Sequence, residues 1–159
     1  AVTINFPTPQ PKAKYAKKRL VHVDHLMLYR PLFAAGATVT LRTDSKPLRD
    51  YALGQFAAAG YDTLWVSDDV RRDHPEHPET EYECRTREMG AVVYGICATP
   101  GEKPTEEQLA TGRAQEQSLA CYLPDDLDEL TYVPLGMEEA VENFRNRARK
   151  GKKRLPQES

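Results

Sequence analysis

The segment ATVTLRTD, residues 37–44, carries the clearest strand signal in the chain. Val39 and Leu41 alternate with polar or charged residues in a β-branched run, which is the period of a strand. Ser45 follows at once and can cap a helix, and Pro47 then falls in the first turn, where a missing N–H costs nothing. The segment therefore predicts a strand that leads directly into a helix.

The predicted helix has one apolar face and a clear end. Five side chains recur at helical spacing and make up this face: Leu48, Tyr51, Ala52, Phe56 and Ala59. Gly60 ends the helix as a C′ residue. DTLWVSDD, residues 62–69, then predicts a buried strand centred on Trp65. A strand, a helix and a second strand in this order favour an α/β layout.

Weaker signals extend this pattern in both directions. Residues 20–24 predict a short strand, with a helix to about residue 35 or an entirely extended segment as the competing interpretations, because Pro31 would kink a helix. Alternating charges and two prolines predict a loop over residues 70–83, and residues 90–100 are a further strand candidate. Thr105 and Gln108 form a capping box that starts a helix to about residue 122.

A last amphipathic helix is predicted over residues 137–150. The expected fold class is α/β or α+β, with a small sheet of about four strands flanked by three to four helices. We expect three regions: an extended basic arm over residues 1–19, a single globular domain over 20–144, and a basic helix end and tail over 145–159. The arm is predicted because three prolines fall within the first 11 residues and a basic run follows.

Positive charge gathers at both ends of the chain. The first 19 residues hold five basic and no acidic side chains, and residues 145–159 hold seven basic side chains and one acidic, although the net charge is −2. Basic segments on an acidic body are typical of contact with phosphate or with an acidic partner. The candidate nucleic-acid-binding residues are Lys14, Lys17, Lys18, Arg19, Arg145, Arg147, Arg149, Lys150, Lys152, Lys153 and Arg154. Solvated, frayed termini are the alternative.

Acidic residues fall where the predicted strands end. These are Asp24, Asp44, Asp68 and Asp69. If the strands are parallel neighbours, the carboxylates line one sheet edge and could hold Mg²⁺ against a phosphodiester. The alternative is that these side chains only cap helices and turns.

The four histidines form two pairs with the same spacing, His22 with His25 and His74 with His77. On a strand, residues three apart point in opposite directions, and the two prolines of the loop, Pro75 and Pro78, should hold His74 and His77 apart. We interpret the pairs as a strand and a turn, and keep one pair joined by an acid from elsewhere as a weak zinc candidate.

The function expected from these features is a small non-enzymatic accessory protein, possibly of phage or mobile-element type. Its acidic body would dock a protein partner, and its basic ends would contact nucleic acid or an acidic surface, without a cofactor. The alternative is a nuclease or phosphohydrolase that depends on a divalent metal, Mg²⁺ or Zn²⁺, and uses the four aspartates. Three widely spaced cysteines and no apolar span predict a reducing, cytoplasmic location without membrane contact. The oligomeric state is left open.

Overall fold

Strand β2 (Val39–Thr43) lies inside a four-stranded sheet and is buried along its whole length. The structure is a computed structural model that describes residues 1–152. The other strands are β1 (Val2–Asn5), β3 (Tyr61–Ser67) and β4 (Tyr94–Pro100). The helices are α1 (Val23–Tyr29), α2 (Lys46–Ala58), α3 (Val70–Asp73), α4 (Glu81–Glu88), α5 (Glu106–Ala114) and α6 (Glu138–Lys152), with 3₁₀ turns η1 (Ala13–Lys18), η2 (Arg30–Leu32), η3 (Leu119–Tyr122) and η4 (Leu127–Glu129).

The strands are ordered β1-β2-β4-β3. β1 pairs with β2 in parallel, whereas β4 pairs with both β2 and β3 in the antiparallel sense. The predicted α/β class with about four strands is confirmed, and the described residues form six α-helices rather than three or four. Because β4 separates β2 from β3, the expectation that acidic strand ends meet as parallel neighbours is wrong.

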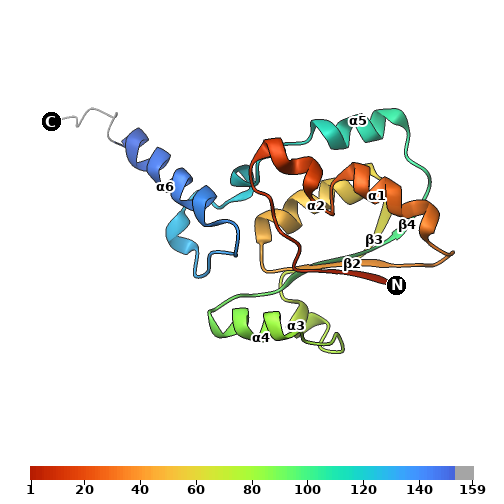
Figure 1. Ribbon diagram of the computed structural model, residues 1–159, viewed down its shortest axis with the longest axis horizontal. Helices are drawn as coiled ribbons and strands as arrows, with labels where there is room; N and C mark the ends of the chain where they lie inside the picture. The colour runs from red at the N-terminus through yellow and green to blue at the C-terminus, as the bar shows by residue number, and fades with distance from the viewer. Residues whose placement is uncertain (153–159) are drawn as a thin grey trace.

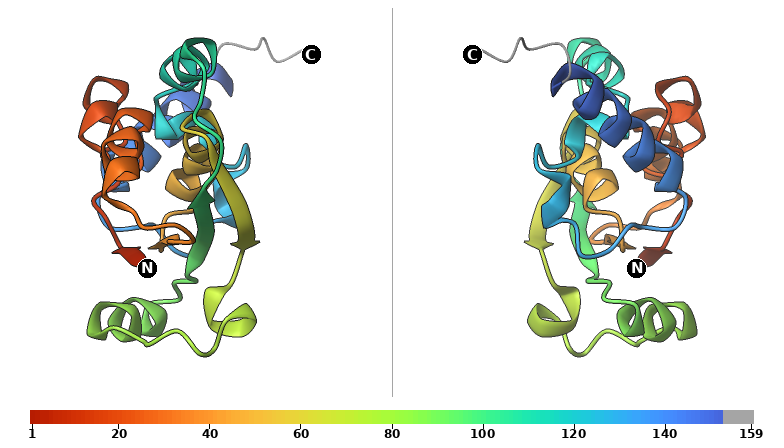
Figure 2. Two further views of the ribbon diagram at one scale, coloured as in Figure 1. Left: turned by 90° about the vertical axis from the view of Figure 1, so that its right-hand side faces the viewer. Right: turned by 90° about the vertical axis from the view of Figure 1, so that its left-hand side faces the viewer.

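α1, α2 and α5 pack together on one side of the sheet (Figures 1 and 2). α3 and α4 lie beyond the end of β3 and the start of β4. The predicted start of α2 is confirmed, since the Ser45 hydroxyl accepts a hydrogen bond from the Leu48 N–H at 3.2 Å. The core joins the buried face of α2 to β2 and β4 through Tyr51, Phe56 and Ile96.

The N-terminal segment is not the extended arm that was expected. Val2–Asn5 is an edge strand of the sheet, and Ala13–Lys18 is a 3₁₀ turn. Arg19 is buried, and its guanidinium donates to the carbonyl oxygens of Pro9, Gln10 and Gln117 at 2.7–3.1 Å. The segment is therefore built into the fold, because main-chain pairing with β2 outweighs its proline content.

Three further expectations need correction. Residues 20–24 are not a strand: α1 begins at Val23, and the His22 ring caps it by accepting a hydrogen bond from the Asp24 N–H. The predicted loop over 70–83 contains α3 and the start of α4, which are capped by Asp69 and Thr80. The helix from Thr105 has the predicted capping box but ends at Ala114, with η3 as a separate turn.

The basic helix end and tail predicted over residues 145–159 lie only partly within the described residues. α6 continues to Lys152, and the side chains of Arg145, Arg147, Arg149 and Lys150 are exposed on it. Lys153 and Arg154 lie outside the described residues, and so does the side chain of Lys152. Within residues 1–152, no helix is both long and apolar enough to cross a membrane.

Candidate functional site

Asp44 lies directly after β2, and its carboxylate accepts hydrogen bonds from two tyrosine hydroxyls in distant parts of the chain. Tyr132 donates to Asp44 Oδ2 at 2.7 Å, and Tyr82 of α4 donates to the same oxygen at 3.2 Å. Asp44 Oδ1 accepts no hydrogen bond from any described residue. The carboxylate thus has one oxygen held in place and one available to a ligand.

The two tyrosines are held in their protonated, donating form. Burial, with the Asp44 charge as a further cause, raises the pKa of Tyr82 to about 12. Burial and the hydrogen bond to Asp44 also raise the pKa of Tyr132. No ion pair to Asp44 forms among residues 1–150. The site therefore has an uncompensated negative charge that two neutral donors orient.

Asp44 also borders a hollow of about 360 Å³. Its walls include Lys46, Tyr94, Tyr122 and Tyr132. This volume is within the range of small-ligand sites, and tyrosine rings offer flat surfaces for an aromatic ligand. The hollow can therefore take a planar, polar molecule with its edge toward the carboxylate.

A buried ion network holds α4, the helix that carries Tyr82, in place. Glu83 is fully buried, with one carboxylate oxygen 2.5 Å from Arg42 Nη2 and the other 2.8 Å from Arg71 Nη2. Arg42 also donates to the Pro78 carbonyl at 3.0 Å, and Arg71 to the His77 carbonyl at 2.8 Å. The network ties the loop before α4 to strand β2.

The segment after β1 completes the site. Phe6 has φ = 46°, in the left-handed region that bulky residues rarely adopt. Its ring packs against Tyr82 with centroids 4.8 Å apart, and the Arg42 guanidinium lies over it at 5.9 Å. Strain of this kind persists where the surroundings hold it and is common at functional sites. The ends of β1 and β2 thus meet at one edge of the sheet.

The structure does not bring the four predicted aspartates together. Asp24 lies in the first turn of α1 and pairs with Arg113 at 2.9 Å. Asp68 pairs with Arg49 at 2.5 Å, which lowers the pKa of Asp68, and Asp69 caps α3. Within the described chain, none of the four belongs to a group of three side chains close enough to share a metal ion.

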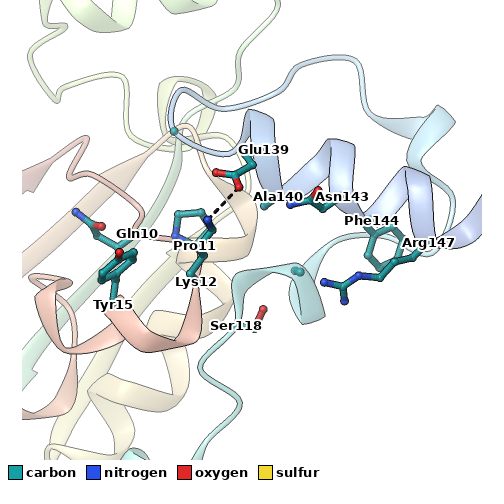
Figure 3. A pocket seen from close by; sticks show the side chains of 12 residues that line it. Gln10, Pro11, Lys12, Tyr15, Ser118, Glu139, Ala140, Asn143, Phe144 and Arg147 are labelled. Carbon is teal, nitrogen blue, oxygen red and sulfur yellow. Dashed lines mark hydrogen bonds and ion pairs between the residues drawn. The ribbon is translucent and has the colours of Figure 1, made fainter.

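A second hollow, of about 430 Å³, lies between η1 and α6 (Figure 3). Lys12 and Tyr15 stand on one wall and Arg147 on the other, and Lys12 pairs with Glu139 at 2.9 Å. Lys14 and Lys18 are exposed, each 4.9 Å from the centroid of the Tyr15 ring. The two basic segments therefore border one hollow, although Arg19 is buried and cannot contact a ligand there.

The histidine pairs lie in different parts of the fold. His22 is buried at the start of α1, and His25 Nδ1 lies 2.7 Å from the Arg19 carbonyl. His74 and His77 lie in the loop between α3 and α4, with ring centroids 5.8 Å apart. The prolines do not separate these two rings, contrary to the expectation from the sequence.

The sequence reasoning missed the partners of Asp44. Arg42 could have been noticed as a charge inside an otherwise buried strand. Thr80 and Glu83 have the spacing of a capping box, which signals a helix start. No local pattern indicates that Tyr82 and Tyr132 meet, because they are far apart in the chain.

Comparison with known proteins decides the class. The family model described as "Putative methyltransferase" matches residues 1–96, which include β1, β2, β3, α4 and every residue of the Asp44 site except those after β4. The chain belongs to this methyltransferase family. The expected non-enzymatic accessory protein of phage type is therefore wrong, and so is the alternative nuclease or phosphohydrolase. The expectation that no cofactor is needed is also wrong, because a methyltransferase requires a methyl donor.

Named relatives are identical to this chain at about a third of the positions over 96–99 residues. A tRNA (guanine-N(7)-)-methyltransferase of Streptococcus equi subsp. zooepidemicus is 32% identical over 97 residues, which are 60% of this chain and 46% of the relative. Proteins of the same name from Exiguobacterium sibiricum (33%, 62% and 46%) and Lysinibacillus sphaericus (33%, 60% and 44%) are similar. The chain spans about half the length of the curated relatives that it matches.

Proposed function

We propose that this chain is the guanine-binding part of a tRNA methyltransferase that acts at N7 of guanine. Family membership and the shared name of the relatives support the reaction and the substrate. The observation that carries the proposal is the Asp44 site, which lies within the matched region apart from Tyr132.

The chemistry of guanine fits a lone, oriented carboxylate. The Watson–Crick edge of guanine presents N1–H and N2–H donors, and Asp44 Oδ1 is available to accept from them. A tyrosine of the hollow, Tyr94 or Tyr132, can stack on the purine, an interaction of about 1–3 kcal/mol per base. Enzymes that modify a base commonly read it in this way after it leaves the helical stack.

Methylation at guanine N7 also calls for a negative charge near the purine rather than for a general base. N7 of guanine carries a lone pair and no proton, so no group has to remove a proton there. The product is a cation, and its charge develops over the purine. A carboxylate that no described cation neutralises stabilises that charge, because electrostatic stabilisation acts where charge develops. Asp44 is in this position in the proposal.

The described residues do not fit the methyl donor. Methyltransferases normally take the methyl group from S-adenosylmethionine. Open α/β sheets bind such nucleotide-like cofactors with a glycine-rich turn after a strand. The segments that follow β1, β2 and β3 here, residues 6–12, 44–45 and 68–69, contain no glycine. No donor-binding role is therefore assigned to the described residues, and more than half of each relative lies outside the match.

The basic hollow supports contact with the tRNA backbone. Lys12 and Arg147 line the hollow (Figure 3), and Lys14, Lys17 and Lys18 are exposed on η1, the turn that contributes Tyr15 to it. Phosphate contacts of this kind position a nucleic acid without reading its sequence. The proposal thus separates base recognition at Asp44 from backbone contact at the two basic segments.

The test compares nucleotide binding by the chain and by Asp44→Asn. We expect the chain to bind guanosine monophosphate more tightly than adenosine monophosphate in equilibrium dialysis. Asp44→Asn should lose this preference by about tenfold, since hydrogen bonds to a charged group contribute about 1.5–3 kcal/mol. Asp62→Asn is the matched control on the far end of β3, and its preference should be unchanged. Equal binding of both nucleotides by the unmodified chain would refute base recognition at this site.

A second measurement tests the reaction itself. Residues 1–96 of this chain replace the matching segment of the Streptococcus equi relative, and labelled methyl transfer to tRNA is followed. We expect the chimera to methylate tRNA at guanine N7 and the Asp44→Asn chimera to be slower by at least about 100-fold. A folded chimera that binds the donor and tRNA but transfers no methyl group contradicts the proposal.

A further inference from the structure

Three potential metal ligands come together in the loop between α3 and α4. One ligand atom each of His74, Glu76 and His77 lies within 4.8 Å of the other two. His74 Nδ1 is 3.3 Å from Glu76 Oε1, and His77 Nε2 is 4.0 Å from the same oxygen. In a tetrahedral site with metal–ligand bonds of about 2.0–2.1 Å, neighbouring donor atoms are roughly 3.3 Å apart. One of the three pairs already has this spacing, and the other two are within 4.8 Å, so that small side-chain rotations bring them to it.

The loop holds both rings in place without an ion. His77 N–H donates to the His74 carbonyl at 3.1 Å, which closes a turn and brings the rings to the same side. Trp65 of β3 stacks on the His74 ring at 3.9 Å and meets the His77 ring edge-on at 5.8 Å. Arg71 fixes the His77 carbonyl at 2.8 Å. The two rings are therefore largely pre-organised, whereas most surface histidines are not.

We infer that His74, Glu76 and His77 bind one late first-row divalent ion of the Ni²⁺, Cu²⁺ and Zn²⁺ group, with water completing its coordination. Two imidazoles and one carboxylate are donors that these ions favour over Mg²⁺ or Ca²⁺. The site is independent of the Asp44 hollow and takes no part in the proposed methyl transfer. All three ligands lie in the loop between α3 and α4, which Arg71 of α3 holds at His77, so a bound ion would cross-link that loop.

The single tryptophan of the chain makes the site directly observable. Cu²⁺ and Ni²⁺ quench tryptophan fluorescence at short range, and Trp65 lies against two of the three ligands. We expect saturable quenching with one ion per chain when Cu²⁺ or Ni²⁺ is added to the protein, and recovery of fluorescence when excess Zn²⁺ displaces Ni²⁺. Mg²⁺ at the same concentration should have no effect.

Three variants locate the site. His77→Ala keeps the Trp65–His74 stack and should weaken Ni²⁺ binding by about 10- to 100-fold, and Glu76→Gln should weaken it less. His25→Ala removes a histidine elsewhere and should bind Ni²⁺ like the unmodified chain. Circular dichroism confirms that each variant is folded, and isothermal titration provides a second binding measurement.

Several outcomes would overturn the inference. Quenching that rises linearly without saturation would show collisional contact only. Equal Ni²⁺ affinity of His77→Ala and the unmodified chain would place the ion elsewhere, as would a loss of affinity in His25→Ala. Because none of these measurements involves tRNA or methyl transfer, their failure leaves the proposed function unaffected.

Discussion

Arg42 and Glu83 form a buried ion pair that joins strand β2 to helix α4, with Arg42 Nη2 2.5 Å from Glu83 Oε2. The pair lies beneath the Asp44 site, since Tyr82, the neighbour of Glu83, donates to Asp44. Arg71 of α3 reaches the second oxygen of Glu83 and also donates to the His77 carbonyl, and so links α3 and the following loop to the same point. Removing the Glu83 charge would leave the buried Arg42 without a charged partner.

Glu83→Gln should therefore destabilise the protein strongly. Breaking a buried ion pair on one side typically costs about 3–5 kcal/mol, because the remaining charge is not compensated. The measurement is the free energy of unfolding from urea denaturation. Glu81→Gln, on the exposed side of the same helix, is the control and should change stability by less than about 0.5 kcal/mol. Similar stabilities of the two variants would show that the pair contributes little.

We expect the folded protein to lose stability in mild acid because of His22. Burial lowers the pKa of His22 below 6.5, and the neutral ring accepts the capping hydrogen bond from the Asp24 N–H. The contribution is therefore present above pH 6.5 and is lost as the pH falls through the lower, folded-state pKa. His22→Asn keeps an acceptor at the cap and should remove part of the pH dependence between pH 7.5 and 5. Urea denaturation at several pH values measures this, and an unchanged pH dependence would contradict it.

Substitution of Arg19 should lower the stability of the protein, whereas substitution of Lys17 should weaken tRNA binding and leave stability unchanged. Arg19→Ala leaves three carbonyl oxygens without their donor and should cost about 2–4 kcal/mol of stability. Lys17→Ala removes an exposed charge and should leave stability unchanged, while tRNA binding weakens and its salt dependence decreases by about one ion. Thermal unfolding and tRNA binding at two salt concentrations separate these effects. A destabilised Lys17→Ala would show that η1 is structural only.

Replacing Gly112 of helix α5 with alanine should destabilise the protein, although alanine has the higher helix propensity. Alanine in an exposed helix is favoured over glycine by about 1 kcal/mol. A Cβ on Gly112 of α5, however, would lie 2.5 Å from the Cβ of Ala58 and 3.3 Å from a methyl group of Val23. Gly112→Ala should therefore destabilise the fold by about 1–3 kcal/mol through overpacking. Ala110→Gly, an exposed position of the same helix, tests propensity alone, and a stabilised Gly112→Ala would refute the close packing.

Local patterns were sufficient for the elements that nearby residues control. The alternation in residues 37–44, the Ser45 cap and the Thr105 capping box depend on contacts within a few residues, and the structure contains all three. The charge pattern of residues 70–83 was less informative. α4 has little apolar surface, and a buried ion pair with a distant strand helps to hold it. A prediction from hydrophobic period alone cannot recognise such a helix.

The sequence by itself determined the α/β class, the β2–α2 unit and the presence of an aspartate at a strand end. Only the tertiary structure decided that β1 is part of the sheet, that β4 lies between β2 and β3, and that Tyr82 and Tyr132 converge on Asp44. The physical reason is the range of the interactions. Caps and side-chain periods act along a few residues, whereas strand order, buried charge pairs and the site depend on contacts between residues up to 88 positions apart.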